Sequence, residues 1–257
     1  MIIRRTTRVG KNTISYAECC EHEEKTWLLI HGLAGSSANW LKFMELVERR
    51  LNGVHVIAPD LLGHGASSTP AVSFSASMEA EAMSEFMSSL GYYSFSVMGN
   101  SLGGWIAMLL ALKGHVGSQV LVDSGGMPLS VIPCLDPNDE DEARALLARI
   151  FSTPQWRTQE MASKLMQARN RGMKNVIRSF LSSQERFMSW SDISKINVPT
   201  LLVWGSDDRL IPVELGRLLS SRIKRSKMII LNGLGHEPML EDPEAFFLAV
   251  SEWIRYW

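Results

Sequence analysis

The chain has 257 residues, of which 46% are hydrophobic and 21% charged, and its formal net charge is −1. This length suits one large domain with a substantial hydrophobic core, and the apolar content excludes a disordered chain. The near-zero net charge does not suggest a polyanionic partner such as a nucleic acid.

Strand and helix patterns alternate along the first half of the chain. Residues 2–9 and 12–18 predict a hairpin that begins a sheet. Further strands are predicted at 26–30, 54–58, 93–98 and 119–123, and helices at 39–51, 77–90 and 102–112. In the second helix, the buried face is predicted to carry Met78, Ala82, Phe86 and Leu90. This order is typical of an α/β fold with a mostly parallel sheet and right-handed crossovers.

The alternation stops between about residues 128 and 192. Helical patterns near 139–151, 157–169 and 172–188 are separated by prolines and by Gly172. Regular order resumes with strands at 199–205 and 227–231, a helix at 212–222, and a last helix with Asp242 as its N-cap. We therefore expect a core of residues 1–127 and 193–257, with residues 128–192 inserted as a helical unit.

A serine lies between glycines where a predicted strand meets a predicted helix. The segment from Gly99 to Gly103 fits G-x-S-x-G, the pattern of a turn so sharp that the serine hydroxyl is exposed at the edge of the sheet. A serine hydroxyl is a weak nucleophile, so Ser101 requires a base and a third group that orients the base. The segment predicts nucleophilic catalysis.

A histidine and several carboxylates follow later strands. His236 comes directly after the last predicted strand, in a loop that can place it over the carboxyl edge of the sheet, and is the candidate base. Asp207 and Asp208 follow the strand at 199–205, and Asp123 ends the strand at 119–123. All three aspartates are candidates for the orienting acid.

These motifs resemble the α/β-hydrolase superfamily over nearly the whole chain. The match includes the His31-Gly32 turn, the turn from Asp60 to Ser67, the serine elbow, the Gly205-x-x-Asp208-x-x-x-Pro212 loop and the Gly235-His236-x-Pro238 loop. The resemblance implies the α/β-hydrolase fold with residues 128–192 as a helical cap. It assigns the acid to Asp208, although some members carry it at the position of Asp123.

The resemblance also implies how the reaction is assisted. The backbone N–H groups of Leu33 and Leu102 would form the oxyanion hole. His31 would shape its turn rather than act as a catalytic base, and His64 would shape its turn rather than bind metal. No cofactor and no metal are expected, since no zinc-ligand spacing is present. Three cysteines without a disulfide framework, no signal peptide and no transmembrane run predict a cytoplasmic protein that does not enter a membrane.

Specificity is expected to depend on the cap. The predicted pocket walls include Trp105 and Met127 from the core and Trp156 and Trp190 from the cap. From Arg144 to Arg178 the cap has eight basic residues and one acidic residue. This pattern is compatible with an anionic substrate or an acidic acyl-carrier partner, but solvated helix faces are the more common cause of such a pattern.

The chain resembles three groups within this superfamily that differ in the reaction they catalyse. Glu237 directly after His236 resembles the carboxylesterases, whereas the C–C hydrolases of aromatic ring-fission products usually have tryptophan there. The elbow and Asp123-Ser124-Gly125-Gly126 are similar to those C–C hydrolases. The pyruvate-eliminating synthase of the menaquinone pathway has an arginine where this chain has Trp105. We predict a serine hydrolase of carboxylic esters with small to medium acyl chains, with C–C hydrolysis as the alternative and a non-catalytic ligand receptor as the third hypothesis.

Overall fold

A single eight-stranded sheet forms the centre of the computed structural model, which describes residues 1–257 except 21–23, 71–72, 129–134, 184 and 186, and the side chains of 171 and 172. The sheet order is β1-β2-β4-β3-β5-β6-β7-β8. The strands are β1 (Ile3–Val9), β2 (Asn12–Cys19), β3 (Lys25–Ile30), β4 (Val54–Pro59), β5 (Phe95–Asn100), β6 (Val116–Val122), β7 (Thr200–Gly205) and β8 (Ser226–Leu231). β1 and β2 pair antiparallel, and β3 to β8 are parallel, which confirms the predicted fold class.

The register of the parallel strands brings their carboxyl ends to one edge. Ile30 pairs with Gly99, Asn100 with Val122, and Val122 with Val203. The loops that follow these strands therefore start close together, as expected for ligand sites in open α/β sheets. Strands β4, β5 and β7 are buried along their whole length, because helices cover both faces of the sheet.

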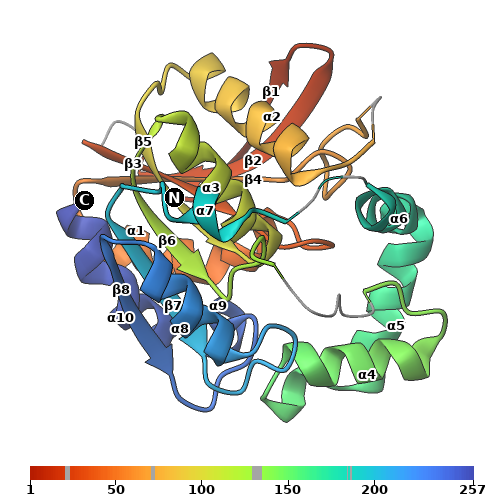
Figure 1. The fold of residues 1–257 in the computed structure, drawn as a ribbon. Helices are drawn as coiled ribbons and strands as arrows, with labels where there is room; N and C mark the ends of the chain where they lie inside the picture. The colour runs from red at the N-terminus through yellow and green to blue at the C-terminus, as the bar shows by residue number, and fades with distance from the viewer. Residues whose placement is uncertain (21–23, 71–72, 129–134, 184, 186) are drawn as a thin grey trace.

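Helices pack on both faces of the sheet (Figure 1). The face covered by α2 (Ala76–Ser89), α3 (Leu102–Lys113) and α8 (Val213–Arg222) forms one apolar core cluster. A second cluster lies under α1 (Leu41–Arg50), which follows a 3₁₀ turn, η1 (Ser37–Trp40), and under α9 (Pro238–Glu241) and α10 (Pro243–Tyr256). The side chain of Asp242 caps α10 by accepting from the Ala245 N–H, as predicted.

The buried face of α2 differs from the prediction. Of the four residues expected there, only Phe86 is fully buried, whereas Met78, Ala82 and Leu90 are half-buried. The buried side chains of this helix are Ala76, Glu79, Ala80, Met83, Phe86 and Met87. Two adjacent apolar columns run along the helix, and periodicity alone does not decide which one meets the sheet.

The chain between β6 and β7 is helical. It contains α4 (Glu140–Ile150), η2 (Pro154–Trp156), α5 (Gln159–Ala168), α6 (Lys174–Ser182) and α7 (Trp190–Ile193). The predicted break at Gly172 and the predicted helix to residue 188 are wrong. A π-helical turn (Arg169–Met173) joins α5 to α6. A π-helical turn accommodates one extra residue without ending the helix, so the chain stays helical past Gly172. Helix α6 then ends at Ser182. We call residues 128–192 the insertion; α4, α5 and α6 stand beside the sheet in Figure 1.

Two remaining expectations concern cysteines and membranes. Cys19 and Cys20 are free thiols, and Cys134 lies outside the described residues. None of the helices within the described ranges combines the length and apolarity that crossing a bilayer requires.

Candidate active site

Ser101 lies at the turn between β5 and α3 with φ 55° and ψ −114°, a conformation that costs energy in any residue with a side chain. The flanking glycines make the turn sterically feasible. A Cβ on Gly99 would lie 2.1 Å from the carbonyl oxygen of Gly103, and a Cβ on Gly103 would lie 2.2 Å from that of Ile30. The strand, sharp turn and helix expected from G-x-S-x-G are therefore present.

The turn after β3 runs alongside Ser101. A Cβ on Gly32 would lie only 3.2 Å from the Cβ of Ser101. The N–H of Leu33 in this turn has no acceptor within the described part of the chain, nor does the N–H of Leu102, the first residue of α3. Two unengaged N–H groups beside a serine are what an oxyanion hole requires.

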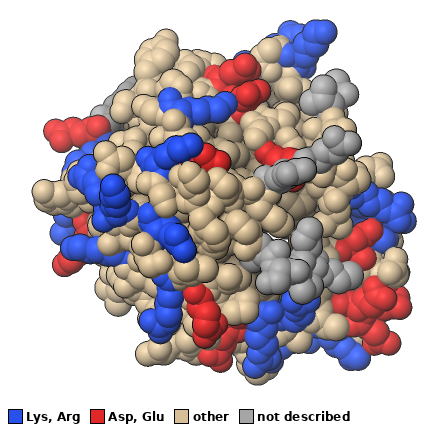
Figure 2. All heavy atoms as spheres, in the orientation of Figure 1, with Lys and Arg blue, Asp and Glu red and all other residues tan. Residues whose placement is uncertain are grey.

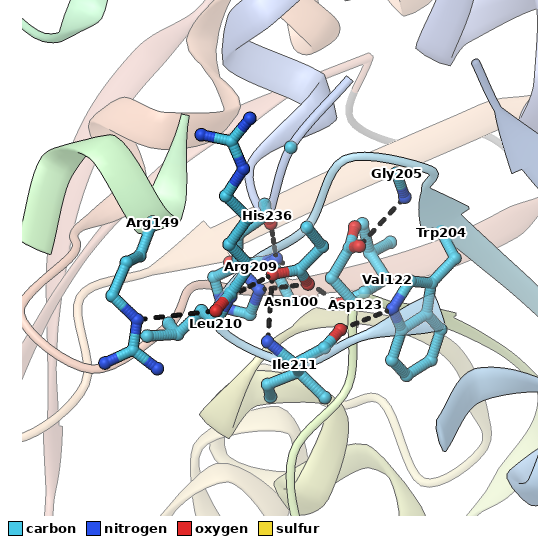
Figure 3. Close-up of polar contacts among 12 residues, drawn as sticks. Asn100, Val122, Asp123, Arg149, Trp204, Gly205, Arg209, Leu210, Ile211 and His236 are labelled. Carbon is cyan, nitrogen blue, oxygen red and sulfur yellow. Dashed lines mark hydrogen bonds and ion pairs between the residues drawn. The ribbon is translucent and has the colours of Figure 1, made fainter. Parts of the chain in front are cut away.

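His236 and Asp208 form a buried pair. The Nδ1 of His236 lies 2.7 Å from Oδ2 of Asp208, and the two residues are 3% and 5% exposed. The other oxygen of Asp208 accepts from the N–H groups of Leu210 and Ile211 at 2.8 and 2.9 Å (Figure 3), which fixes the carboxylate. The Nε2 of His236 is buried without a hydrogen-bond partner among the described residues, so it remains available to a serine hydroxyl.

The charge state of His236 follows from this pairing. Burial lowers the pKa of His236, but the negative charge of Asp208 and its hydrogen bond more than offset that effect, and the pKa is raised above its ordinary value. Asp208 therefore favours the imidazolium that a general base becomes after it takes a proton.

The other two acid candidates lie in different environments. Asp207 is exposed and accepts from the Ser206 hydroxyl at 2.7 Å. Asp123 is fully buried at φ 44°, and its Oδ1 accepts from the N–H of Gly205 at 2.9 Å. Burial and then the charge of Asp208 raise the pKa of Asp123 well above its usual range. These effects favour the protonated, neutral form of Asp123.

Asp123, Asp208 and His236 offer donor atoms that all lie within 4.8 Å of one another. Such a cluster has the composition of a metal site. Nδ1 of His236 is already engaged by Asp208, however, and both oxygens of Asp208 have hydrogen-bond partners. The same geometry is fully accounted for by a catalytic pair with a neutral neighbour, and the absence of a metal stays a prediction.

Asn100 joins the loops around the pair and was not anticipated from the sequence. Its Nδ2 donates to the carbonyl oxygens of His236 and Val122 at 2.9 and 3.3 Å (Figure 3). The residue occupies a variable position of the G-x-S-x-G pattern, so only its place before Ser101 could have drawn attention to it.

Glu241 links the histidine loop to the insertion. Its Oε1 accepts from the N–H of Gly235 at 2.7 Å, and its Oε2 accepts from the N–H groups of Ser152 and Thr153 at 2.8 Å each. The N–H of His236 also donates to the carbonyl oxygen of Ile150, the last residue of α4, at 2.6 Å. The position of His236 thus depends on the end of α4.

His31 and His64 hold two turns together. Nε2 of His31 accepts from the N–H of Leu61 at 3.0 Å, and Nε2 of His64 accepts from the N–H of Ala34 at 3.2 Å. Burial lowers the pKa of His31 to about 4 and that of His64 to about 3. Both rings are therefore neutral acceptors near pH 7, which agrees with their expected role in shaping the turns.

A cavity of about 320 Å³ opens on Ser101 and His236, near the small end of the ~300–1,000 Å³ typical of ligand sites. Leu33 and Leu102 also line it, with Trp105. Its walls from the insertion are mainly apolar: Leu146, Leu147, Ile150, Phe151, Met161, Leu165, Met173, Ile177 and Phe180. A small or medium apolar group suits such walls.

Three of the four expected wall residues lie elsewhere. Trp105 lines the cavity, but Met127 is fully buried in the core. Trp156 stacks on Phe151 with ring centroids 5.2 Å apart, and Trp190 lies under the guanidinium of Arg222. None of these three residues lines the described part of the cavity. The prediction selected them by their size, and the size of a residue does not reveal the direction of its side chain.

Four of the eight basic residues counted in the insertion form ion pairs within the described structure. Asp136 bonds Arg169 at 2.5 Å and Arg178 at 3.4 Å, and both Arg144 and Lys164 pair with acids on their own helices. Asp136 lies outside the range counted from the sequence, which made the insertion look more basic than it is. Acidic and basic side chains interleave over α4 and α5 in Figure 2. The arrangement agrees with solvated helix faces and does not test an acyl-carrier partner; the side chain of Arg171 lies outside the described part.

Known proteins resemble this chain in sequence and structure. The profile of the alpha/beta hydrolase family matches residues 27–250. Lipase 1 of Psychrobacter immobilis is 30% identical over 259 residues, covering 93% of this chain and 80% of that lipase. The 2-hydroxy-6-oxononadienedioate/2-hydroxy-6-oxononatrienedioate hydrolase of Burkholderia vietnamiensis is 27% identical over 248 residues, or 89% of this chain and 86% of that enzyme. The crystal structure of a membrane phospholipase A, a bacterial virulence factor, superimposes with a TM-score of 0.85 at 27% identity, covering 99% and 87% of the two chains.

Proposed function

The chain belongs to the alpha/beta hydrolase family and is a serine hydrolase of small molecules, and we propose that its substrates are carboxylic esters of small to medium acyl chain. One observation carries the proposal. The strained Ser101, the His236–Asp208 pair and two unengaged N–H groups surround one apolar cavity. This combination is suited to acyl transfer from an apolar ester.

The proposed reaction begins with attack of the Ser101 hydroxyl oxygen on the ester carbonyl carbon. Nε2 of His236 takes the hydroxyl proton, and the N–H groups of Leu33 and Leu102 donate to the oxyanion. Collapse of the tetrahedral intermediate breaks the bond to the alcohol oxygen, which receives the proton from His236. Water then attacks the acyl-enzyme with His236 as base again, and the carboxylic acid leaves. Asp208 orients the imidazole and stabilises its charged form throughout.

The insertion acts as a cap in this proposal. Its helices α4, α5 and α6 contribute most of the apolar walls. The acyl chain would lie against these walls, because apolar contact favours its transfer from water. A volume of about 320 Å³ supports acyl chains of small to medium length.

C–C hydrolysis is the second candidate, and the 27% identical relative from Burkholderia vietnamiensis favours it. That relative acts on a dioate, a substrate with two carboxylates. In this chain the two cations in the described cavity lining, Lys164 and Arg169, are engaged by Glu160 and Asp136. No unpaired cation is thus offered to a dioate by the described walls, and an uncharged ester suits them better.

The test compares Ser101→Ala with the wild type on p-nitrophenyl esters of increasing acyl length and on one ring-fission product. We expect loss of ester turnover on the order of 10⁵- to 10⁶-fold, since removal of a triad nucleophile has effects of that size. A fluorophosphonate probe should label Ser101 in the wild type only. The matched control is Ser221→Ala, an exposed serine of α8, which should retain turnover and labelling. Faster turnover of the ring-fission product than of every ester would contradict ester hydrolysis and support the second candidate.

A further inference from the structure

Glu237 is a carboxylate in the wall of the cavity. It follows His236 in the chain, and its Oε2 accepts from Nδ2 of Asn39 at 3.0 Å. Both residues line the cavity, together with Gly35 from the turn after β3. Within the described lining, Glu237 is the only acidic residue. The catalytic arrangement does not use it.

The charge of Glu237 is not balanced by the other lining residues. Lys164 places its Nζ 2.6 Å from Oε1 of Glu160, and the Nε of Arg169 lies 2.5 Å from Oδ1 of Asp136. Glu237 itself is bonded to a neutral amide, and no described lysine or arginine forms an ion pair with it. The wall beside His236 therefore carries a negative charge whenever Glu237 is ionised.

The surroundings of Glu237 control when it ionises. Burial raises the pKa of Glu237 above its ordinary value, and the charge of Glu241 on α9 acts in the same direction. The positive form of His236 and the hydrogen bond from Asn39 oppose these effects. Glu237 consequently ionises at a higher pH than an ordinary glutamate, and its hydrogen-bond partner does not prevent that ionisation.

The cavity has polar as well as apolar lining residues. The insertion supplies mainly leucine, isoleucine, phenylalanine and methionine side chains, and its two lining cations are held in ion pairs. Asn39 and Glu237 are bonded to each other, and Asn39 lies beside Gly35 of the turn after β3. An acyl chain gains most from the apolar walls, which leaves the polar wall to the alcohol part of an ester. A carboxylate acceptor binds a hydroxyl donor there and repels a second carboxylate.

We propose that Glu237 is a specificity-determining residue that favours esters whose alcohol part carries a hydroxyl donor and excludes esters whose alcohol part carries a carboxylate. This inference rests on the proposed ester hydrolysis, whose substrate class it narrows. It also gives a physical reason for discrimination against substrates of the dioate type.

The experiment uses two butyrate esters that share one acyl group, 2-hydroxyethyl butyrate and butanoyloxyacetate. The measured quantity is the ratio of kcat/KM for the hydroxyl ester to that for the carboxylate ester. We expect a wild-type ratio of roughly ten to a hundred. Repulsion between two carboxylates a few ångströms apart at intermediate dielectric would slow the carboxylate ester by about that factor. Glu237→Gln should bring the ratio close to one. Glu252→Gln removes an exposed carboxylate from α10 and should keep the wild-type ratio.

A second measurement needs no variant. The wild-type ratio should increase with pH as Glu237 ionises. Hydrolysis of both esters requires neutral His236, so the titration of His236 changes both rates equally and does not change their ratio. A wild-type ratio near one at pH 8, or the same ratio in Glu237→Gln, would overturn the inference while leaving ester hydrolysis intact. Failure of the wild type to hydrolyse either ester would overturn both proposals.

Discussion

The sheet core and the insertion are stabilised in different ways. The core buries two extensive apolar clusters on the two faces of the sheet, and α6 and the residues after it add Val176 and Met188 to one of them. Helices α4 and α5 instead share a small cluster of their own, which contains Ala143, Leu147, Phe151 and Ala162. A region with few buried apolar side chains opens locally at lower free energy than a large core. The difference teaches that the reacting groups lie on the extensively buried core, whereas α4 and α5 supply substrate walls from a region that buries fewer apolar side chains.

Polar contacts join the insertion to the core at several places, and two of these junctions differ in what they reach. At the end of α4, Glu241 bonds the N–H groups of Ser152 and Thr153. Beyond α6, Glu185 accepts from the N–H groups of Ala76 and Ser77 at the start of α2, at 2.6 and 2.8 Å. Only the first junction also touches the loop of His236, through the N–H of Gly235. A displacement of the end of α4 can therefore shift His236 through Glu241 and Gly235. A displacement of the segment beyond α6 has no such connection through Glu185.

Among the effects that test this comparison, the largest concerns the acid on the core. Asp208→Asn should lower kcat for esters by roughly 10³- to 10⁴-fold, because the amide no longer fixes the tautomer of His236 or stabilises its charge. Asp123→Asn should cost less than about tenfold, since a neutral amide replaces a neutral acid and keeps an acceptor for the Gly205 N–H. Steady-state kinetics of both variants measure the difference, and the reverse ranking would transfer the acid role to Asp123.

The next effect is on the stability of the core. Glu79 is fully buried on α2, and burial raises its pKa to about 8 from 4.5. Between these two pH values the folded state holds a proton that the unfolded state releases, so the free energy of unfolding falls as pH rises. Glu79→Gln removes this loss and should stabilise the protein at pH 8 by up to about 5 kcal/mol, at 1.36 kcal/mol per pKa unit.

Urea unfolding at pH 4.5 and pH 8 measures the effect of Glu79→Gln. The variant and the wild type should differ little at pH 4.5 and most at pH 8. Glu81→Gln, an exposed residue of the same helix, is the control and should change stability by less than about 1 kcal/mol at either pH. An equal gain for Glu79→Gln at both pH values would show that Glu79 is not protonated in the folded protein.

A smaller effect tests the junction between the two regions. Glutamine in place of Glu241 has one acceptor oxygen, so it loses either the Gly235 bond or the bonds to Ser152 and Thr153. We expect kcat to fall roughly ten- to a hundredfold with little change in KM, because His236 is displaced while the cavity walls remain. Glu244→Gln on α10 should retain kcat. A rise in KM at unchanged kcat would show that Glu241 shapes the walls instead.

The smallest effect concerns the insertion alone. Leu147→Ala removes a side chain from its small cluster and should lower the free energy of local opening by about 2 kcal/mol. Hydrogen exchange would then be faster in α4 and α5, with exchange in β3 and β5 unchanged. If the amides of β3 and β5 accelerated equally, the two regions would unfold as one unit and the comparison would fail.

The features predicted from the sequence are those with local signals. Strands β3 to β8 each contain a short group of apolar residues, and the glycines around Ser101 mark a turn that little else can adopt. His236 and Asp208 could be selected because each follows a strand whose end reaches the same edge of the sheet. Their contact was then a consequence of topology.

The features that were missed depend on partners far along the chain. Nothing local to Glu241 indicates that it binds the N–H groups of Ser152 and Thr153, some ninety positions earlier. Similarly, Arg169 appears as an uncompensated charge until Asp136 is placed beside it. Side-chain direction also decided the cavity walls, where leucines of α4 contribute and Trp156 does not.

The backbone conformation of Ser101 affects the thermal stability of the protein. A side chain at φ 55° destabilises the folded state by about 1–3 kcal/mol, whereas glycine adopts such angles freely. Replacing the nucleophile with glycine therefore relieves the turn while abolishing attack on the ester. The inactive protein should tolerate heat better than the active one, and it would hold an uncleaved ester long enough for the bound substrate to be seen directly.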